Sequence, residues 1–262
     1  MRTGFEELDK IINLEKPQLI LLTGTYLIEE FSGDIANNVC LKQECEVLEI
    51  VRCKKEYMLQ RMFVNEANVN YRKWYRKNEY TNEELKRIGQ CIVNLIEGTK
   101  RLPTIIEQDM SLYDLKKVER LVLDYADNYA DSENINTLII LDIFPLSSNS
   151  KNSRDRRESL RLIKNLKKIS RKLRCPIIVI DNIETTKKYN LQNKTCNYIT
   201  KEYIDNIDKI NKYVDTFIIT NINNGKRNIY NVDVYNKKDI IGSCKLKYDF
   251  NCRKFKNNIE GE

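Results

Sequence analysis

The feature that most constrains the fold is a series of short apolar runs separated by amphipathic segments. Runs such as QLILL, EVLEIV, NTLIILD and CPIIVIDN are compact and almost wholly apolar. This pattern is typical of strands buried on both faces of a parallel sheet. The segments between them carry apolar residues every three or four positions, as crossover helices do. Three further strand-like runs, YVDTFIIT, NIYNVDVY and SCKLKYDF, follow near the end. The sequence therefore predicts an α/β fold, with a mostly parallel sheet flanked by helices and antiparallel strands at the C-terminal end.

Length and local signals define the expected organisation. A chain of 262 residues fits one large α/β domain, expected over 1–255, with a flexible charged tail over 256–262. Thr81 is a predicted helix N-cap and Gly98 a predicted stop, while Ser111 is the predicted cap of the next helix. The polar stretches 147–153 and 185–200 are expected to be disordered.

Composition excludes several classes of function. The chain has no histidine, and its eight cysteines form no Cys-x-x-Cys pair. No histidine-based triad is therefore available, no metal site is expected, and reduced thiols in a cytoplasmic protein are the simplest interpretation. No apolar run approaches the roughly 20 residues of a membrane span. The formal charge of +7 permits a nucleic-acid partner without requiring one.

The segment 18–38 has the strand–turn–helix form of a phosphate-binding P-loop. Such loops use small residues, a lysine that neutralises phosphate, and a serine or threonine that holds magnesium. The turn and helix start contain Gly24, Thr25, Tyr26, Glu29 and Glu30. No lysine occurs between Lys16 and Lys42. The glutamates would repel a triphosphate by roughly 1–4 kcal/mol at a separation of about 4 Å, so this degenerate nucleotide-binding loop is expected to reject nucleotide.

Several motifs occur together in a specific order. They are TGFEELD, EYMLQRMFVNEANVNYRK followed by YTNEEL, NTLIILDIFPL, CPIIVIDNIE and the closing strands. In this order they resemble the C-terminal, RecA-like domain of DnaB-type replicative DNA helicases, and the similarity extends from Thr3 to about Phe255. The resemblance implies a RecA-like P-loop NTPase fold and a role in DNA replication in a bacterium or phage.

The resemblance also implies where catalytic residues should stand. Asp142 matches the Walker B carboxylate, although an ordinary strand-end carboxylate that caps the next turn is the alternative interpretation. The family's water-polarising glutamate is replaced by Arg52, and its sensor glutamine by Asn182. A lysine and an arginine that reach the neighbouring subunit's ATP are replaced by Tyr235 and Lys237. Lysine cannot reproduce the planar fork of an arginine finger.

A basic segment follows the expected Walker B strand. Residues 151–174 contain 11 basic and two acidic side chains. The resemblance implies that Arg154, Arg156 and Arg157 lie in a loop region that contacts the DNA backbone, which would give sequence-independent binding to single-stranded DNA. The alternative is a solvated helix face that keeps a lysine-rich protein soluble.

Three hypotheses follow for function. The first is a DnaB-like protein that no longer hydrolyses ATP, uses no cofactor, and binds DNA, associates with itself or docks on a helicase ring. The second is an active ATP-dependent replicative helicase subunit that uses ATP and magnesium at an atypical nucleotide site. The third is an interaction scaffold with no affinity for DNA.

Overall fold

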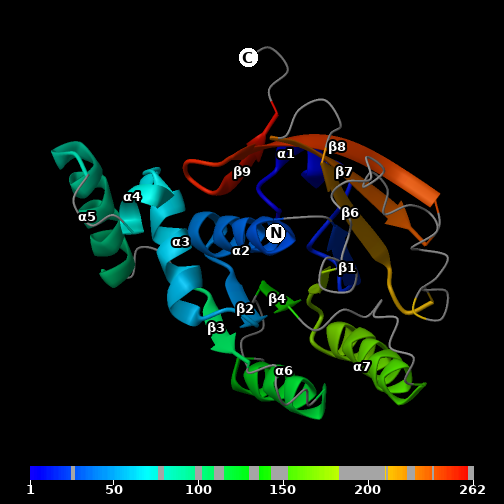
Figure 1. Ribbon diagram of the computed structural model, residues 1–262. Helices are drawn as coiled ribbons and strands as arrows, with labels where there is room; N and C mark the ends of the chain where they lie inside the picture. The colour runs from blue at the N-terminus through cyan, green and yellow to red at the C-terminus, as the bar shows by residue number, and fades with distance from the viewer. Residues whose placement is uncertain are drawn as a thin grey trace.

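The computed structural model describes residues 1–24, 27–75, 80–97, 102–108, 115–129, 136–142, 153–182, 210, 212–222, 228–237 and 239–258. Within these residues, nine strands form one mixed sheet in the order β3-β2-β4-β5-β1-β6-β7-β8-β9. The strands from β3 to β6 in this order run parallel, and β7, β8 and β9 continue the sheet with antiparallel pairings (Figure 1). The predicted fold class is confirmed.

The strands and helices alternate along most of the chain. The strands are β1 Leu19–Gly24, β2 Glu46–Val51, β3 Thr104–Glu107, β4 Thr137–Asp142, β5 Ile177–Asn182, β6 Thr216–Ile222, β7 Ile229–Asn236, β8 Asp239–Asp249 and β9 Lys254–Asn257. The helices are α1 Glu6–Asp9, α2 Ile28–Gln43, α3 Lys55–Ala67, α4 Tyr71–Tyr75, α5 Asn82–Ile96, α6 Leu115–Tyr129 and α7 Ser153–Lys172.

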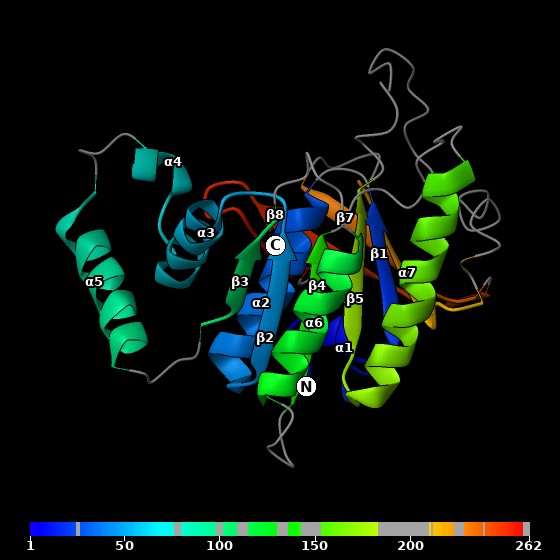
Figure 2. The ribbon, with the colours of Figure 1, turned by 90° about the horizontal axis from the view of Figure 1, so that it is seen from below.

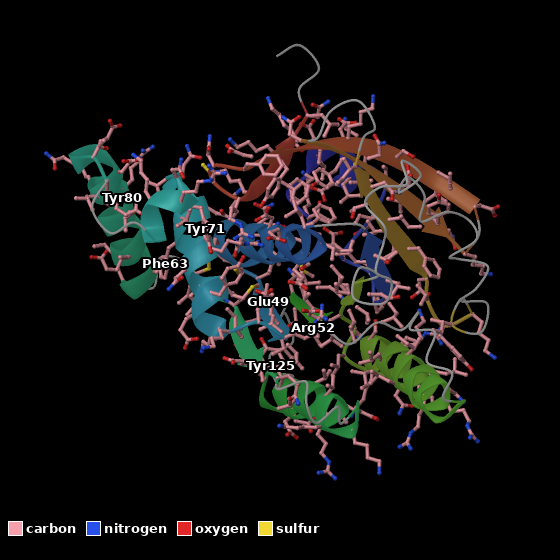
Figure 3. All side chains as sticks on the ribbon, in the orientation of Figure 1. Glu49, Arg52, Phe63, Tyr71, Tyr80 and Tyr125 are labelled. Atoms are coloured by element: carbon pink, nitrogen blue, oxygen red, sulfur yellow. The ribbon has the colours of Figure 1, made fainter. Side chains whose placement is uncertain are left out.

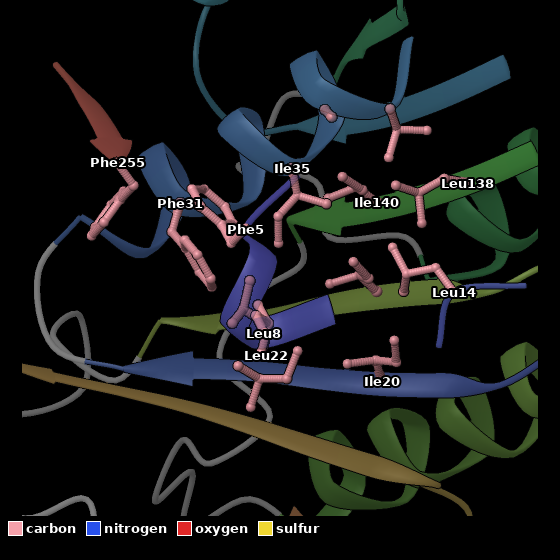
Figure 4. Close-up of a cluster of buried hydrophobic side chains, with 14 of the residues drawn as sticks. Phe5, Leu8, Leu14, Ile20, Leu22, Phe31, Ile35, Leu138, Ile140 and Phe255 are labelled. Carbon is pink, nitrogen blue, oxygen red and sulfur yellow. The ribbon is translucent and has the colours of Figure 1, made fainter. Parts of the chain in front are cut away.

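The central strands are buried on both faces, as their apolar runs predict. Ile20 and Leu22 of β1 belong to the core that packs against α1 and α2, where Phe31 lies (Figure 4). Leu19 and Leu21 of the same strand point the other way, into the core beneath α6 and α7. Figure 2 shows α6 and α7 side by side on that face. Successive side chains of a strand point to opposite faces, so a run without polar alternation can only be buried between two helical layers.

The carboxyl ends of the parallel strands bring the expected site residues to one edge of the sheet. Gly24 ends β1, Arg52 directly follows β2, and Asp142 ends β4. The chain leaves β1 into α2 on one face and continues from β4 toward α7 on the other. Ligands of open α/β sheets bind where successive connections diverge in this way.

Helix α5 begins as its sequence predicts. The Thr81 hydroxyl accepts a hydrogen bond from the Glu84 N–H at 3.2 Å, and the Glu84 carboxylate accepts one from the Thr81 N–H at 2.8 Å. This reciprocal capping box confirms Thr81 as the N-cap. The predicted stop at Gly98 and the predicted cap Ser111 lie outside the described residues.

The predicted start of the C-terminal tail, at residue 256, lies inside the last strand. Lys256 and Asn257 belong to β9, which pairs with β8, so the sheet extends past the boundary predicted after residue 255. The Phe255 N–H also donates to the Asp34 carboxylate of α2 at 2.7 Å, which ties this strand to the core. The strand was not predicted because its one apolar residue, Phe255, lies between charged residues and forms no apolar run. Residues 259–262, and the stretches 147–152 and 185–200, lie outside the described residues.

Candidate nucleotide site

Helix α2 begins at the carboxyl end of β1 without a conventional cap. Leu27 precedes the helix in a left-handed conformation, with φ 60°, and its side chain makes no capping hydrogen bond. Glu29 and Glu30 occupy the first turn. Carboxylates stabilise the positive end of a helix dipole, which in a P-loop faces phosphate. The protein's own acidic side chains therefore occupy the end of the helix where an anion would bind.

Arg52 joins Glu29 to Asp142. Its Nε lies 2.8 Å from Oδ1 of Asp142, and its Nη2 lies 2.9 Å from Oε1 of Glu29. The side-chain exposed fractions are 16% for Arg52, 42% for Glu29 and 5% for Asp142. Figure 3 labels Arg52 beyond the end of β2, beside β4. One guanidinium thus bridges the carboxylate at the start of α2 and the expected Walker B carboxylate.

Burial of Asp142 opposes its ionisation. Removal from water raises the pKa of this carboxyl group to about 6, although the hydrogen bond and positive charge of Arg52 act in the opposite direction. The negative charge of Glu29 adds to the rise in the pKa. Asp142 therefore depends on Arg52 to remain ionised near neutral pH.

Glu30 turns to a different arginine. Its carboxylate forms an ion pair with Arg253, which lies in the turn between β8 and β9. The guanidinium carbon of Arg253 lies 4.6 Å from the ring centroid of Tyr71 and 5.5 Å from that of Tyr57. These cation–π contacts hold the C-terminal hairpin against α3 and α4. Glu30 consequently stabilises the fold, and in the described residues it is Glu29 that reaches the partner of Asp142.

Arg61 of α3 is buried beneath the first turn of α2. With 1% of its surface exposed, it donates to the backbone carbonyls of Glu29 at 3.4 Å and Glu30 at 2.8 Å. A Cβ atom at Gly33 would lie 2.5 Å from Arg61 Nη2. The glycine in α2 is therefore required for this close approach.

Asp34 is the buried acceptor of the same network. Its Oδ1 accepts from Arg61 Nη2 at 3.0 Å and from Asn65 Nδ2 at 3.0 Å, and its Oδ2 accepts the Phe255 N–H. Burial raises the pKa of Asp34 to about 6, against the opposing effect of Arg61. Each of three α2 carboxylates, at positions 29, 30 and 34, is thus matched by an arginine from a separate part of the chain.

Gly24 has a packing role that needs no phosphate. A Cβ atom at this position would overlap the Thr220 hydroxyl and lie 2.7 Å from the Thr220 carbonyl oxygen of the neighbouring strand. The glycine is therefore accounted for by the contact between β1 and β6, whatever the loop binds. Thr25 and Tyr26, the other two residues of the predicted degenerate loop before α2, lie outside the described residues.

The residues present do not fit ATP and magnesium. Phosphates at the start of α2 would meet the Glu29 carboxylate, and no lysine is available from this segment. A magnesium ion at Asp142 would have to displace a bound guanidinium.

Of the other three positions that the resemblance singled out, two differ in how far they are exposed to solvent. Tyr235 is buried in the core beneath α7, so the residue aligned with the family's ATP-reaching lysine faces the protein interior. Lys237 is exposed, with φ 58°, in the turn after β7. Asn182 ends β5, but its side chain is outside the described part.

The predicted DNA-binding arginines lie in the first turns of α7, not in the loop region where the resemblance placed them. All three belong to the helix. Arg157 is exposed, and the structure does not describe the side chains of Arg154 and Arg156. Sequence reasoning missed Arg61 and Arg253 as functional neighbours of α2. Arg61 is the one charged position among the buried residues of α3, a pattern that could have indicated a buried ion pair.

Comparison with known proteins identifies the family. A sequence model described as the DnaB-like helicase C terminal domain matches residues 1–196. The chain belongs to this family. Among curated proteins, no sequence matches.

Solved structures agree on the fold. The DnaB-like chain is similar to a solved ATPase domain, with a TM-score of 0.73 and 13% identity over 98% of this chain and 90% of that one. It is also similar to the solved structure of a DnaB-like replicative helicase, described together with that helicase's interactions with primase. This match has a TM-score of 0.74 and 14% identity, over 98% of this chain and 63% of that one. The RadB recombinase matches with a TM-score of 0.56 and 12% identity, over 98% and 99% of the two chains. The DnaB-like chain thus spans less than two thirds of the primase-interacting helicase.

In the described part of the chain, no helix is both long and apolar enough to cross a membrane.

Proposed function

We propose that this DnaB-like domain does not hydrolyse ATP and acts in DNA replication by binding DNA or a helicase partner. The observation that supports this most directly is the bridge from Arg52 to Glu29 and Asp142. It replaces the metal and phosphate contacts of a working site with contacts within the protein.

The chemistry of the bridge argues against turnover. The family resemblance implies a glutamate at position 52 that polarises water, and an arginine is permanently protonated and cannot accept a proton. Arg52 also holds the carboxylate that would bind magnesium. Nucleotide binding would therefore have to break two ion pairs and place phosphate beside Glu29.

Calorimetric titration of the purified chain with a non-hydrolysable ATP analogue and magnesium tests this proposal. We expect no saturable binding up to millimolar concentrations and no release of phosphate from ATP. An active DnaB-like helicase domain, titrated in parallel, serves as the positive control. Micromolar binding together with turnover that Asp142→Asn abolishes would instead establish the active-helicase alternative.

Single-stranded DNA is the proposed ligand of the arginines at positions 154, 156 and 157. The start of α7 projects beyond that of α6 in Figure 2, and Arg157 is exposed. Phosphate contacts there would be sequence-independent and sensitive to salt. Changing the three arginines to glutamate should weaken binding of a mixed-sequence oligonucleotide. Binding that is absent in the unaltered protein would favour the scaffold hypothesis.

Another RecA-like domain, either a second copy or a helicase subunit, is the proposed protein partner. Ile240 and Ile241, at the start of β8, have exposed fractions of 59% and 49%. They follow Lys237 in the hairpin that the family resemblance places at a subunit boundary. Light scattering of the protein alone and mixed with a DnaB-like helicase should detect association, and Ile240→Asp with Ile241→Asp should reduce it. Equal association of this double variant would exclude the hairpin as the contact.

A further inference from the structure

The solvent side of α7 carries a row of basic side chains. Arg161, Lys164, Lys168 and Arg171 are all exposed, and their spacing of three, four and three residues places them on one side of the helix. We call these four residues the basic ridge. At 1.5 Å per residue, it extends over about 15 Å. Nitrogen-tipped side chains project from α7 away from the sheet in Figure 3.

The opposite side of α7 performs the packing. Leu162, Ile163, Leu166 and Ile169 are buried in the core beneath the helix. Lys167, although basic, is also buried and forms an ion pair with Asp215, directly before β6. The basic ridge is therefore separate from the side chains that hold α7 to the sheet.

The charge on the ridge is not balanced within its own helix. Residues 159–174 contain seven basic and no acidic side chains. Like charges three or four residues apart on a helix repel one another and destabilise it. On the adjoining α6, Glu119 accepts hydrogen bonds from Asn165 at 3.1 Å. A solubilising surface would gain more from mixed charges, whereas a binding surface for a polyanion requires this uniform sign.

We infer that the basic ridge binds the phosphate backbone of a single-stranded nucleic acid. Successive positively charged residues on one side of a helix are about 5–6 Å apart at Cβ, so long side chains can follow successive phosphates. Every α7 residue whose side chain is described and exposed is basic, so this surface lacks the aromatic and apolar anchors on which protein interfaces depend, which argues against an acidic protein. Arg157 lies one turn before Arg161, so the ridge extends the proposed path of DNA from the start of α7 along its length. This inference deepens the proposed DNA-binding role but is independent of ATP hydrolysis.

The test uses fluorescence anisotropy with single-stranded DNA and RNA oligonucleotides of one mixed sequence, without nucleotide, over a series of salt concentrations. The test variant is Lys164→Glu/Lys168→Glu. The matched control is Lys86→Glu/Arg87→Glu on the exposed side of α5, which changes the net charge by the same amount.

The ridge variant should lose roughly tenfold or more in affinity at low salt, and its slope of log K against log salt should fall by about 1.4, since each single-strand phosphate contact contributes about 0.7. The control should retain affinity within about twofold. Comparable affinity for DNA and RNA would identify the shared phosphate backbone as the ligand. Binding of DNA alone would identify single-stranded DNA as the ligand and would still support the ridge as its binding surface.

Three results would overturn the inference: equal losses in the two variants, no measurable binding by the unaltered protein, or displacement of the protein by poly-glutamate as effectively as by DNA. A loss confined to the Arg154→Glu/Arg156→Glu/Arg157→Glu variant would reject the ridge and leave the proposed contact at the start of α7 intact. Circular dichroism of each variant should match that of the unaltered protein, because the substituted ridge and control side chains are exposed.

Discussion

The start of α2 and the outer side of α7 differ in whether their charged side chains have partners of opposite charge nearby. At α2, Glu29, Glu30 and Asp34 each meet an arginine of the same chain. On α7, the four residues of the basic ridge are exposed, and their helix provides no carboxylate beyond position 158. The first region satisfies its charges internally, so it has little to offer a charged ligand. The second has seven basic and no acidic side chains over residues 159–174, an excess of positive charge that a polyanion can neutralise.

Three ion pairs hold the start of α2 to the rest of the fold. The three arginines link α2 to the end of β2, to α3 and to the turn before β9. Stability at the α2 site therefore depends on ion pairs, and the following predictions test that dependence against the exposed ridge.

The largest effect is expected from Arg61→Met. This change leaves Asp34 buried without its guanidinium partner, and removing one member of a buried ion pair typically costs about 3–5 kcal/mol. The free energy of unfolding in urea should fall by that amount. Lys172→Met at the exposed end of α7 is the matched control and should change stability by less than about 0.5 kcal/mol. Similar losses from both changes would contradict the contrast between the regions.

A somewhat smaller loss is expected from Gly24→Ala. The added methyl group would lie 2.7 Å from a backbone oxygen of Thr220, which cannot rotate away, and overpacking of this kind costs roughly 1–3 kcal/mol. Gly89→Ala in α5 is the control, because nothing lies within 4 Å of its added Cβ. That change should stabilise the protein by up to about 1 kcal/mol through helix propensity. If Gly24→Ala is neutral in urea unfolding, the packing explanation for this glycine fails.

Arg52→Met should reduce stability by about 1.5 kcal/mol at neutral pH, since it removes hydrogen bonds to two carboxylates. The loss should depend on pH. The pKa of Asp142 is raised in the folded state to about 6, so its contribution to stability is greatest below its unfolded pKa of about 4 and is lost as the pH rises through 6. Without Arg52 the pKa should rise further, and the difference between variant and unaltered protein should grow from pH 5 to pH 8.

Asp142→Asn provides the control for that pH dependence. In the Arg52→Met/Asp142→Asn double variant, the buried charge is absent, so most of the additional loss between pH 5 and pH 8 should disappear. Urea midpoints measured at both pH values give the comparison. If the single and double variants respond identically to pH, Asp142 is not the group that Arg52 keeps ionised.

The sequence was sufficient for the layers of the fold but not for its final strand. Apolar runs such as the one that became β1 specify two-sided burial by composition alone, and the Thr81 capping box is local. β9 pairs with β8 across the turn between them, but its sequence KFKN places one apolar residue between charged ones, so apolar periodicity does not mark it. The hydrogen bond from the Phe255 N–H to Asp34, 221 residues away, ties the strand to the core and cannot be read from local sequence.

The candidate site shows the same division. A lysine-free turn with Glu29 and Glu30 could be read directly from the sequence. The partner of each glutamate could not, because Arg52 and Arg253 come from distant segments and their side-chain directions depend on packing. The sequence showed a lysine-free, acidic turn, and the structure added the arginines that pair with its two glutamates.

The smallest effect on stability is expected on the ridge, where Lys164→Gln/Lys168→Gln removes two like charges four residues apart. Since this pair is mutually repulsive, the free energy of unfolding should stay the same or rise by roughly 0.2–0.5 kcal/mol at low salt, and the gain should vanish at high salt. The same variant should bind single-stranded DNA more weakly, which separates the two regions: arginines at α2 are needed for folding, whereas lysines on α7 act against it. A clear loss of stability would mean that the ridge lysines have structural partners, and the contrast between the two regions would then be wrong.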